Sequence, residues 1–412
     1  MADYFLEDIV INILHRLPVK TLLRCTAVSK SWRSLITSPE FTLSHLQFAS
    51  SSQQAAPSLL LRRCIKSSER YELYSDDESS SFARLAAFQF PFKSMNSFFT
   101  IVGSCNGLLC LSDDRVYLMN TVVLWNPSVR RSVLLPKPNL IYNSYGSFTQ
   151  YLGFGFDSVC SDYKVVRITY VDVAVHPQIE LYKLSSGVWK DLSCCVELVP
   201  VICSGSRQVY VNGASHWTAR YMDSYDVVVA FDMCLEVFRT MKLPVLHLSD
   251  NQLRSRDLAV YIDCLALTLW DVSGAEPCFC VWVMQEYGVE KSWTKKLCFD
   301  FTSIGSEFVR PLWIRKHGEA VVVCQDGRLV CVDQEGGWVK DVGVRGHRSD
   351  TYQCSLVVDS FVCSLVLLER GCCYTYDASG LDTLQGDDGD SAGSSGSEYE
   401  KGSESISKHR LL

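Results

Sequence analysis

The chain has no long apolar run, no basic excess and none of the short motifs that mark common enzymes. No window of about twenty residues is apolar throughout, as a membrane-spanning helix would need. Residues 1–17 mix acidic with apolar side chains, so we expect no signal peptide. The formal net charge of -7 argues against general nucleic-acid binding, which needs a basic face. We therefore expect a soluble protein of the cytoplasm or the nucleus.

Paired metal-ligand motifs are also absent, although the chain has 19 cysteines. Zinc sites usually combine a CxxC pair with further cysteines or histidines. The nearest approaches are Cys278-x-Cys280 and the vicinal pairs Cys194-Cys195 and Cys372-Cys373. Many of the cysteines lie within apolar runs, where a reduced thiol behaves as a small buried hydrophobe. We expect no structural metal and no cofactor.

Three further features each admit a functional and a structural interpretation. Residues 153–156, GFGF, superficially resemble a dinucleotide loop, but no helical pattern follows, so we interpret them as a tight strand. His216 follows a hairpin turn without a nucleophile nearby in sequence, and we interpret it as a packed strand residue. Residues 76–78, DDE, suggest a cation site, but such a run is usually a solvated turn. We therefore predict no catalytic residues.

What the chain does have, over its first fifty residues, is helical periodicity. Apolar residues recur at helical spacing within 6–17, and the Leu17-Pro18 pair ends that helix. The segment 19–36 predicts further helix, closed by Pro39. So short a module cannot bury all these side chains alone. Either another chain covers them, or the helices fold onto the rest of this chain.

The run LEDIVINILHRLPVKTLLRCTAVSKSWRSLI, residues 6–36, resembles an F-box. The resemblance implies that the module docks on a Skp-type adaptor, which links it to a cullin-based ubiquitin ligase. The family usually has Leu-Pro where this chain has Phe5-Leu6, which puts the first adaptor contact in doubt. The motif positions implied to bind the adaptor are Leu6, Ile13, Leu14, Leu17, Pro18, Leu22, Leu23, Val28, Lys30, Trp32, Leu35 and Ile36.

Beyond residue 56 the pattern changes to short β-branched and aromatic runs joined by turn signals. Asn106-Gly107, Asn212-Gly213 and Asp326-Gly327 each lie between two apolar runs and predict hairpins. The hairpins repeat at a nearly constant interval. Aligning Tyr74, Trp125, Tyr182, Phe231, Trp282 and Val332 gives steps of 51, 57, 49, 51 and 50 residues.

A period near fifty with about four strands per unit is typical of a kelch-like β-propeller. A β-sandwich would also contain hairpins, but it would not repeat them at this spacing. The sequence favours six blades, with seven possible, and strands around 58–61 and 355–358 complete the closing blade. The predicted fold class is mainly β with a small α-helical N-terminal module.

Several phrases between residues 100 and 300 resemble the F-box-associated domain of plant F-box proteins, in the family's order. They are GSCNGLLC at 103–110, LWNP at 124–127, GFGFD at 153–157, DYKVV at 162–166, VNGASHW at 211–217 and EYGVEKSWT at 286–294. The resemblance implies a plant origin and a protein-recognition role for the propeller.

These observations divide the chain into an F-box at 1–48, a linker at 49–55, a propeller at 56–385 and a tail at 386–412. The tail is rich in glycine, serine and acids, and we expect it to be disordered. A regulatory role is one interpretation of the tail. The composition favours an inert solvated tail, because such segments are common without function.

In a propeller, connections between blades share one face with connections between second and third strands. We predict that the target binds there, on the connections 139–150, 220–226, 246–257 and 344–352. Loops on a rigid scaffold often carry binding residues, and aromatic and arginine side chains often dominate interfaces. The predicted residues are Tyr142, Tyr145, Phe148, Arg220, Tyr221, Tyr225, Arg254, Arg256, Arg345, His347, Arg348 and Tyr352. The arginine excess in the last two connections suggests an acidic or phosphorylated target.

Two classes of function follow. The first is a non-catalytic receptor that binds a target protein within a Skp–cullin–F-box ligase. The second is a propeller enzyme, which would need convergent titratable or metal-binding residues and no adaptor-docking module. A third interpretation keeps the F-box but places the protein outside a ligase.

Overall fold

The computed structural model describes most of the first compact unit of the chain, residues 1–375, and none of the second, residues 376–412. The described residues are 2–51, 58–65, 68–76, 82–94, 98–113, 121–139, 148–171, 176–193, 199–221, 225–244, 253–271, 278–300, 308–334, 339–346 and 356–368. The tail predicted at 386–412 lies outside them. No helix in these ranges is long and apolar enough to cross a membrane.

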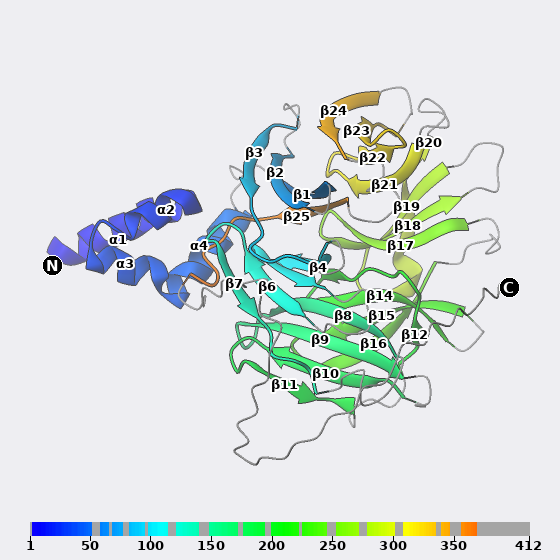
Figure 1. The fold of residues 1–412 in the computed structure, drawn as a ribbon, viewed down its shortest axis with the longest axis horizontal. Coiled ribbons are helices and arrows are strands. Elements are labelled where there is room, and N and C mark those ends of the chain that lie inside the picture. Colours follow the sequence, from blue (N-terminus) through cyan, green and yellow to red (C-terminus); the bar gives the residue numbers. More distant parts are fainter. Residues whose placement is uncertain are drawn as a thin grey trace, which may run out of the picture. The chain divides into compact units, whose positions relative to one another are not determined.

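The N-terminal module consists of four helices. They are α1 (Ala2–His15), α2 (Val19–Cys25), α3 (Lys30–Thr37) and α4 (Pro39–Ser51) (Figure 1). Pro18 is the N-cap of α2, as its fixed φ and missing N–H suit. The segment 19–36 forms two helices, because Ser29 caps α3 by accepting the Trp32 amide at 3.1 Å.

The helix α4 differs from the prediction. Pro39 begins this helix instead of closing the previous one, and Ser38 Oγ accepts the Phe41 amide at 3.1 Å. Since α4 runs to Ser51, residues 49–51 of the predicted linker are helical. The small polar residues there suggested a linker, but tertiary packing of Phe41 and Leu46 outweighs weak local propensity.

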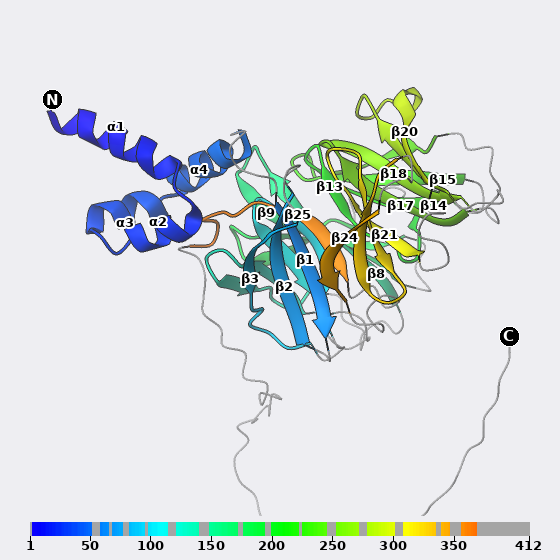
Figure 2. The same ribbon diagram turned by 90° about the horizontal axis from the view of Figure 1, so that it is seen from above.

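The rest of the described chain forms six antiparallel sheets, the blades of a six-bladed β-propeller (Figures 1 and 2). The first sheet contains β4 (Thr100–Cys105), β5 (Leu108–Ser112), β6 (Val122–Asn126) and β7 (Arg131–Leu134). The second contains β8 (Phe148–Asp157), β9 (Asp162–Val171), β10 (Gln178–Lys183) and β11 (Val188–Asp191). The third contains β12 (Val201–Ile202), β13 (Val209–Val211), β14 (Ala214–Tyr221), β15 (Tyr225–Asp232) and β16 (Val237–Lys242). The fourth sheet contains β17 (Leu253–Tyr261), β18 (Cys264–Asp271), β19 (Cys278–Met284) and β20 (Trp293–Asp300), with a 3-10 turn at Glu290–Ser292 before β20. The fifth contains β21 (Phe308–Ile314), β22 (Ala320–Cys324), β23 (Arg328–Val332) and β24 (Val339–Arg345).

The sixth sheet closes the ring from both ends of the domain. Its order is β25 (Val357–Phe361), β1 (Ser58–Ile65), β2 (Ser68–Ser75) and β3 (Arg84–Phe88). The strand β25 pairs with β1 from Ser58↔Phe361 to Arg62↔Val357 (Figure 2). The prediction that strands from both ends complete the closing blade is confirmed. The last strand ends at Phe361, three residues later than expected.

Each pair of neighbouring sheets encloses one buried apolar cluster, and the six clusters run once around the ring. In β1, Leu60 packs towards the β4–β7 sheet, whereas Leu59 and Leu61 pack towards the β21–β24 sheet. Successive side chains of a strand point to opposite faces, so a strand covered on both sides needs an unbroken apolar run. This explains why many strands here lack alternation.

The six residues aligned in the sequence all lie in the third strand of their sheet, which confirms the period. The hairpin turns are confirmed with one difference. Both residues have positive φ at Asn106-Gly107 (52° and 77°) and at Asn212-Gly213 (51° and 75°). At Asp326-Gly327 only the glycine does (83°), and Asp326 Oδ1 instead accepts the Arg328 amide at 3.0 Å.

Candidate functional site

The predicted adaptor-binding residues of the helical module fall into three groups by the exposure of their side chains. Leu14, Leu22 and Ile36 are fully buried in its own core. Leu17, Leu23, Trp32 and Leu35 are half-buried, and Ile13, Pro18, Val28 and Lys30 are exposed. The side chain of Leu6 lies outside the described part. The three buried residues hold the module together, so contact with an adaptor stays a prediction for the half-buried and exposed groups.

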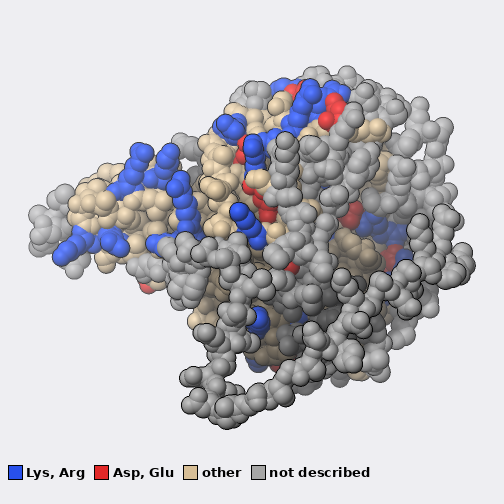
Figure 3. Space-filling view, viewed as in Figure 1, with Lys and Arg blue, Asp and Glu red and all other residues tan. Residues whose placement is uncertain are grey.

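Two of the exposed residues are apolar and far from covered. Ile13 is 55% exposed and Val28 is 66% exposed. The module also has five exposed basic side chains, and Figure 3 shows lysine and arginine gathered on the helices. They are Arg16, Lys20, Arg24, Lys30 and Arg33. Exposed apolar and basic side chains on one small module suit a partner whose surface combines apolar with acidic side chains.

Part of the module's apolar surface is covered by the propeller itself. Leu14, Leu22, Ile36 and Phe41 share one buried cluster with Val129, from the β6–β7 turn, and with Leu365. The alternative in which the helices fold onto the rest of the chain is therefore realised for this part of the surface, and coverage by another chain stays a prediction for the exposed residues.

The segment that carries Leu365 is anchored by a buried asparagine. Asn126 Nδ2 donates to the carbonyls of Ser364 at 3.1 Å and Val366 at 2.8 Å. Gly107 makes room nearby, since a Cβ there would meet the Val362 carbonyl. The phrases NGLL and LWNP thus hold the segment that contacts the helical module, a role that sequence reasoning missed.

The strand order fixes which connections share a face of the propeller. Strands alternate in direction, so connections between sheets leave at the same face as connections between second and third strands. We call this face the loop face. The predicted connections 139–150, 220–226, 246–257 and 344–352 all belong to it. The β6–β7 turn and residues 362–368, which contact the helical module, belong to the opposite face.

Five of the twelve predicted target-binding residues lie on the loop face within the described side chains. They are Phe148, Arg220, Tyr221, Arg256 and Arg345. Tyr225 and Arg254 lie in β15 and β17, but their side chains are outside the described part. Tyr142, Tyr145, His347, Arg348 and Tyr352 lie outside the described residues altogether.

Two of the predicted arginines share one carboxylate. Arg220 Nε lies 2.7 Å from Asp226 Oδ1, and the Arg256 guanidinium pairs with Asp226 Oδ2. Burial and the neighbouring Arg220 lower the pKa of Arg256 from its usual range. Asp226 thus brings two guanidiniums together at one place on the loop face, and clustered arginines suit an anionic group on a partner. Sequence reasoning missed Asp226, since Arg256 reaches it from the next blade.

The connection at 139–150 is held at both ends by a buried ion pair. Arg167 and Glu180 are register partners on β9 and β10, with N···O 2.6 Å. Glu180 Oε1 accepts the Asn139 amide at 2.8 Å. Arg167 donates to Gln150 Oε1 at 2.8 Å and lies over the Phe148 ring, 5.6 Å from its centroid. The pair thus fixes Phe148, and its signal in the sequence was a charged residue inside each of two apolar strands.

The predicted Arg345 ends β24 and is exposed. It pairs in register with Arg328, whose guanidinium contacts Asp326 in the β22–β23 turn. The Arg345 carbonyl accepts from Arg63 at 2.7 Å. Basic side chains therefore gather on this sector of the loop face as well.

The features considered for catalysis have structural partners. His216 is fully buried, and its ring nitrogens contact the Val209 carbonyl at 3.1 Å and the Tyr287 hydroxyl at 2.7 Å. Burial lowers the pKa of His216 to about 4, so the ring stays neutral at physiological pH. Residues 153–156 lie inside β8, where a Cβ on Gly153 would meet the Trp217 ring.

The interpretation of residues 76–78 as a solvated turn is wrong for its first residue. Asp76 is buried, and its Oδ1 lies 2.6 Å from Arg315 Nε. This pair joins the closing blade to its neighbour. Residues 77 and 78 lie outside the described part.

Comparison with known families matches both halves of the chain. The model of the F-box domain matches residues 7–44, and that of the F-box associated beta propeller domain matches residues 65–368. The second match alone covers well over half of the chain.

Curated relatives from Arabidopsis thaliana cover nearly the same extent. The chain is similar to "F-box/kelch-repeat protein At3g23880", with 28% identity over 77% of this chain and 87% of the relative. It is similar to "F-box protein CPR1", with 29% identity over 86% of this chain and 88% of the relative. Among solved structures, TolB from Acinetobacter baumannii aligns with 69% of this chain and 68% of its own at 11% identity and a TM-score of 0.33. That score is too low to carry an argument.

Proposed function

The chain belongs to the family of F-box proteins with an F-box-associated β-propeller domain, and we propose that it is the substrate-recognition subunit of a Skp–cullin–F-box ubiquitin ligase. In this proposal the helical module binds the Skp-type adaptor and the loop face of the propeller binds a target protein. Partner proteins carry out ubiquitin transfer, and this chain is not catalytic. It acts in the cytoplasm or the nucleus.

One observation carries the proposal: the helical module is attached to the propeller through a buried cluster and still keeps apolar and basic side chains exposed. Leu365 and Val129 cover the attached side, while Ile13 and Val28 remain exposed. A module fixed in this way presents its exposed apolar residues to an adaptor while the loop face stays accessible to a target. A scaffold outside a ligase would also use these residues, so the test must follow ubiquitin transfer as well as binding.

Replacing both exposed apolar residues, Ile13→Asp with Val28→Asp, should lower the affinity for a Skp-type adaptor by about thirtyfold or more. Truncating a central interface anchor costs about 2 kcal/mol, and an introduced carboxylate adds desolvation. Adaptor binding by the full-length chain is measured by isothermal titration calorimetry. Ubiquitin-chain formation by the assembled ligase should fall with it.

The matched control is Val159→Asp, because Val159 is 80% exposed in the β8–β9 turn of the propeller and is not part of the cluster that joins the helices to it. It should bind the adaptor like the parent chain. All variants should keep the parent melting temperature, since exposed substitutions usually change stability by less than about 0.5 kcal/mol. Parent-like adaptor affinity in the folded double variant would sink this assignment.

The loop face leads to a second expected result. Replacing Arg254, Arg256, Arg345 and Arg348 with alanine should reduce target ubiquitination without changing adaptor binding. These arginines supply the positive excess that suits an acidic or phosphorylated target. Proteins ubiquitinated in a plant extract by the reconstituted ligase are quantified by mass spectrometry, with parent and variant compared at equal concentration.

Lys316→Ala with Gln334→Ala serves as the control, because both residues are exposed in turns of the opposite face. This pair should leave the set of ubiquitinated proteins unchanged. If it abolishes their modification while the four-arginine variant does not, the target binds the other face. A propeller enzyme would instead turn over a small molecule without any adaptor.

A further inference from the structure

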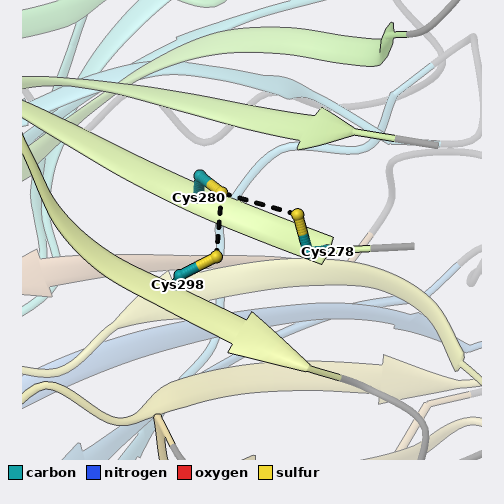
Figure 4. A group of neighbouring side chains, drawn as sticks. All are labelled: Cys278, Cys280 and Cys298. Atoms are coloured by element: carbon teal, nitrogen blue, oxygen red, sulfur yellow. Dashed lines mark hydrogen bonds between the residues drawn. The ribbon is translucent and has the colours of Figure 1, made fainter. Parts of the chain in front are cut away.

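Three cysteine side chains from one hairpin point towards one another (Figure 4). Cys278 and Cys280 lie two residues apart on β19, so they share one face of the strand. Cys298 on β20 is the register partner of Cys280. The Cys280 sulfur lies 3.6 Å from that of Cys278 and 3.0 Å from that of Cys298. All three sulfur atoms lie within 4.8 Å of one another.

The sequence showed only the first two of these residues, because Cys298 is brought in by strand pairing. Among the described residues this is the one group of three potential ligand side chains so arranged, and it contains sulfur alone. Sulfur ligands select soft ions such as copper(I) and zinc. Zinc in structural sites takes four ligands, whereas three thiolates complete a trigonal site.

The separations suit a trigonal site. With metal–sulfur bonds of about 2.3 Å, the three sulfurs of a planar site are about 4 Å apart. Two of the sulfur–sulfur separations, 3.0 Å and 3.6 Å, are within about 1 Å of that value, and the third is at most 4.8 Å. Small rotations of the three cysteine side chains therefore suffice to reach the trigonal geometry, while the β19–β20 ladder holds the backbone in place.

The surroundings suit an anionic complex that is partly shielded from water. Cys280 is buried, whereas Cys278 and Cys298 are half-buried and leave an entry path. Leu269 on β18 pairs with Cys280 on the other side and is itself buried. A register shift between Val281 and Trp282 places Lys295 opposite Trp282, two residues along β19 from Cys280. Three thiolates and one monovalent cation carry a net charge of -2, which the Lys295 ammonium partly offsets.

We propose that Cys278, Cys280 and Cys298 bind one soft monovalent metal ion of the copper(I) class through three thiolates. Binding replaces three S–H bonds with three metal–sulfur bonds and releases three protons, with no change of oxidation state. The bound ion joins the third and fourth strands of this blade near the loop face. The site is independent of adaptor docking and goes beyond the receptor function.

The test uses the full-length reduced chain under anaerobic conditions, titrated with copper(I) against a chromophoric chelator. Because the chain has 19 cysteines, the bound site is located by alkylation with iodoacetamide followed by peptide mass spectrometry. One equivalent of copper(I) should protect the three cysteines together. The parent melting temperature should rise with free copper(I), as expected when a ligand binds only the folded state.

Cys278→Ser and Cys298→Ser should each weaken copper(I) binding by about tenfold or more. Replacing a residue that only hydrogen-bonds a metal ligand already lowers metal affinity by about that factor. Both residues are half-buried, so these variants avoid the folding risk of replacing Cys280. Cys160→Ser is the matched control, because Cys160 is exposed and outside the group; it should bind like the parent.

Three outcomes overturn the proposal. Protection spread evenly over many cysteines means adventitious binding. Protection of the same three residues by zinc(II) and not by copper(I) means a divalent site. A Cys280–Cys298 disulfide that forms in air, without copper(I) protection in the reduced chain, means a redox pair.

Discussion

Lys164→Met should lower the free energy of unfolding by about 3–5 kcal/mol, because it removes the cation from a buried ion-pair network. Lys164 Nζ lies 2.7 Å from Asp157 Oδ2 and 2.6 Å from Glu236 Oε1. It also donates to the Met233 carbonyl at 2.7 Å. The side chains of Lys164 and Asp157 are each 1% exposed, so the variant leaves a carboxylate buried without its partner. Urea unfolding followed by tryptophan fluorescence measures the loss.

The matched control removes a cation from the same network where water can replace it. Lys183 Nζ lies 2.6 Å from Glu236 Oε1, but its side chain is 32% exposed. Lys183→Met should therefore cost less than about 1 kcal/mol, as exposed ion pairs usually do. Equal losses in the two variants would show that burial does not set the strength of this network.

The pH dependence of the Lys164→Met effect follows from the same contacts. Burial alone raises the pKa of Asp157, but hydrogen bonds from Lys164 and from the Cys160 amide hold that pKa well below its usual range. The stabilisation is complete above the unfolded pKa of about 3.9 and is lost as the pH falls through the folded pKa. The stability difference between parent and variant should therefore stay nearly constant from neutrality down to about pH 5 and narrow as the pH is lowered further, below about 4. A difference that widens in acid contradicts this account.

The propeller is predictable from the sequence because its signals are local and repeated. Each blade contains its own hairpin turns, and an apolar or aromatic residue recurs at one place in the third strand, from Tyr74 to Val332. The turn at Asn106-Gly107 needs positive φ at both positions, which few other residue pairs adopt easily. Six repetitions of one such unit leave little choice of architecture.

The helical module is less predictable, because the periodicity that marks a core also marks an interface. Leu14, Leu22 and Ile36 have the spacing of contact residues, yet they face inward. The sequence does not show that Leu365, more than three hundred residues away, covers one side of the helices. The helix α4 was missed because its boundary proline and small polar end are typical of a break.

The candidate sites depend most on contacts between distant segments. Arg220 and Arg256 meet through Asp226, Asp76 is neutralised by Arg315, and Cys298 joins its group through strand pairing. Each of these pairings requires the register of neighbouring strands or blades. Composition and spacing identify the side chains, but the ring of blades determines which ones meet.

Closure of that ring gives the second large effect: a chain ending at Arg345 should fail to fold as a soluble monomer. It lacks β25, so β1 loses the partner that pairs with it from Ser58 to Arg62. It also lacks Val358 and Phe361, which belong to the two clusters on either side of the closing blade. The unpaired edge of β1 then becomes a template for pairing between molecules. Size-exclusion chromatography and circular dichroism measure the result.

Truncation also removes residues 362–368, so a full-length variant separates strand closure from contact with the helices. Val358→Asp with Phe361→Asp places a carboxylate in each cluster, where burying an unpaired charge is strongly unfavourable. It should unfold or aggregate like the truncated chain, whereas a chain ending at Gln385 keeps β25 and should melt like the parent. A soluble, monomeric double variant with the parent melting temperature would mean that five sheets are enough to keep the propeller folded without an intact sixth sheet. The ring would then be held by the clusters between the other blades, and the pairing of its two ends would be dispensable.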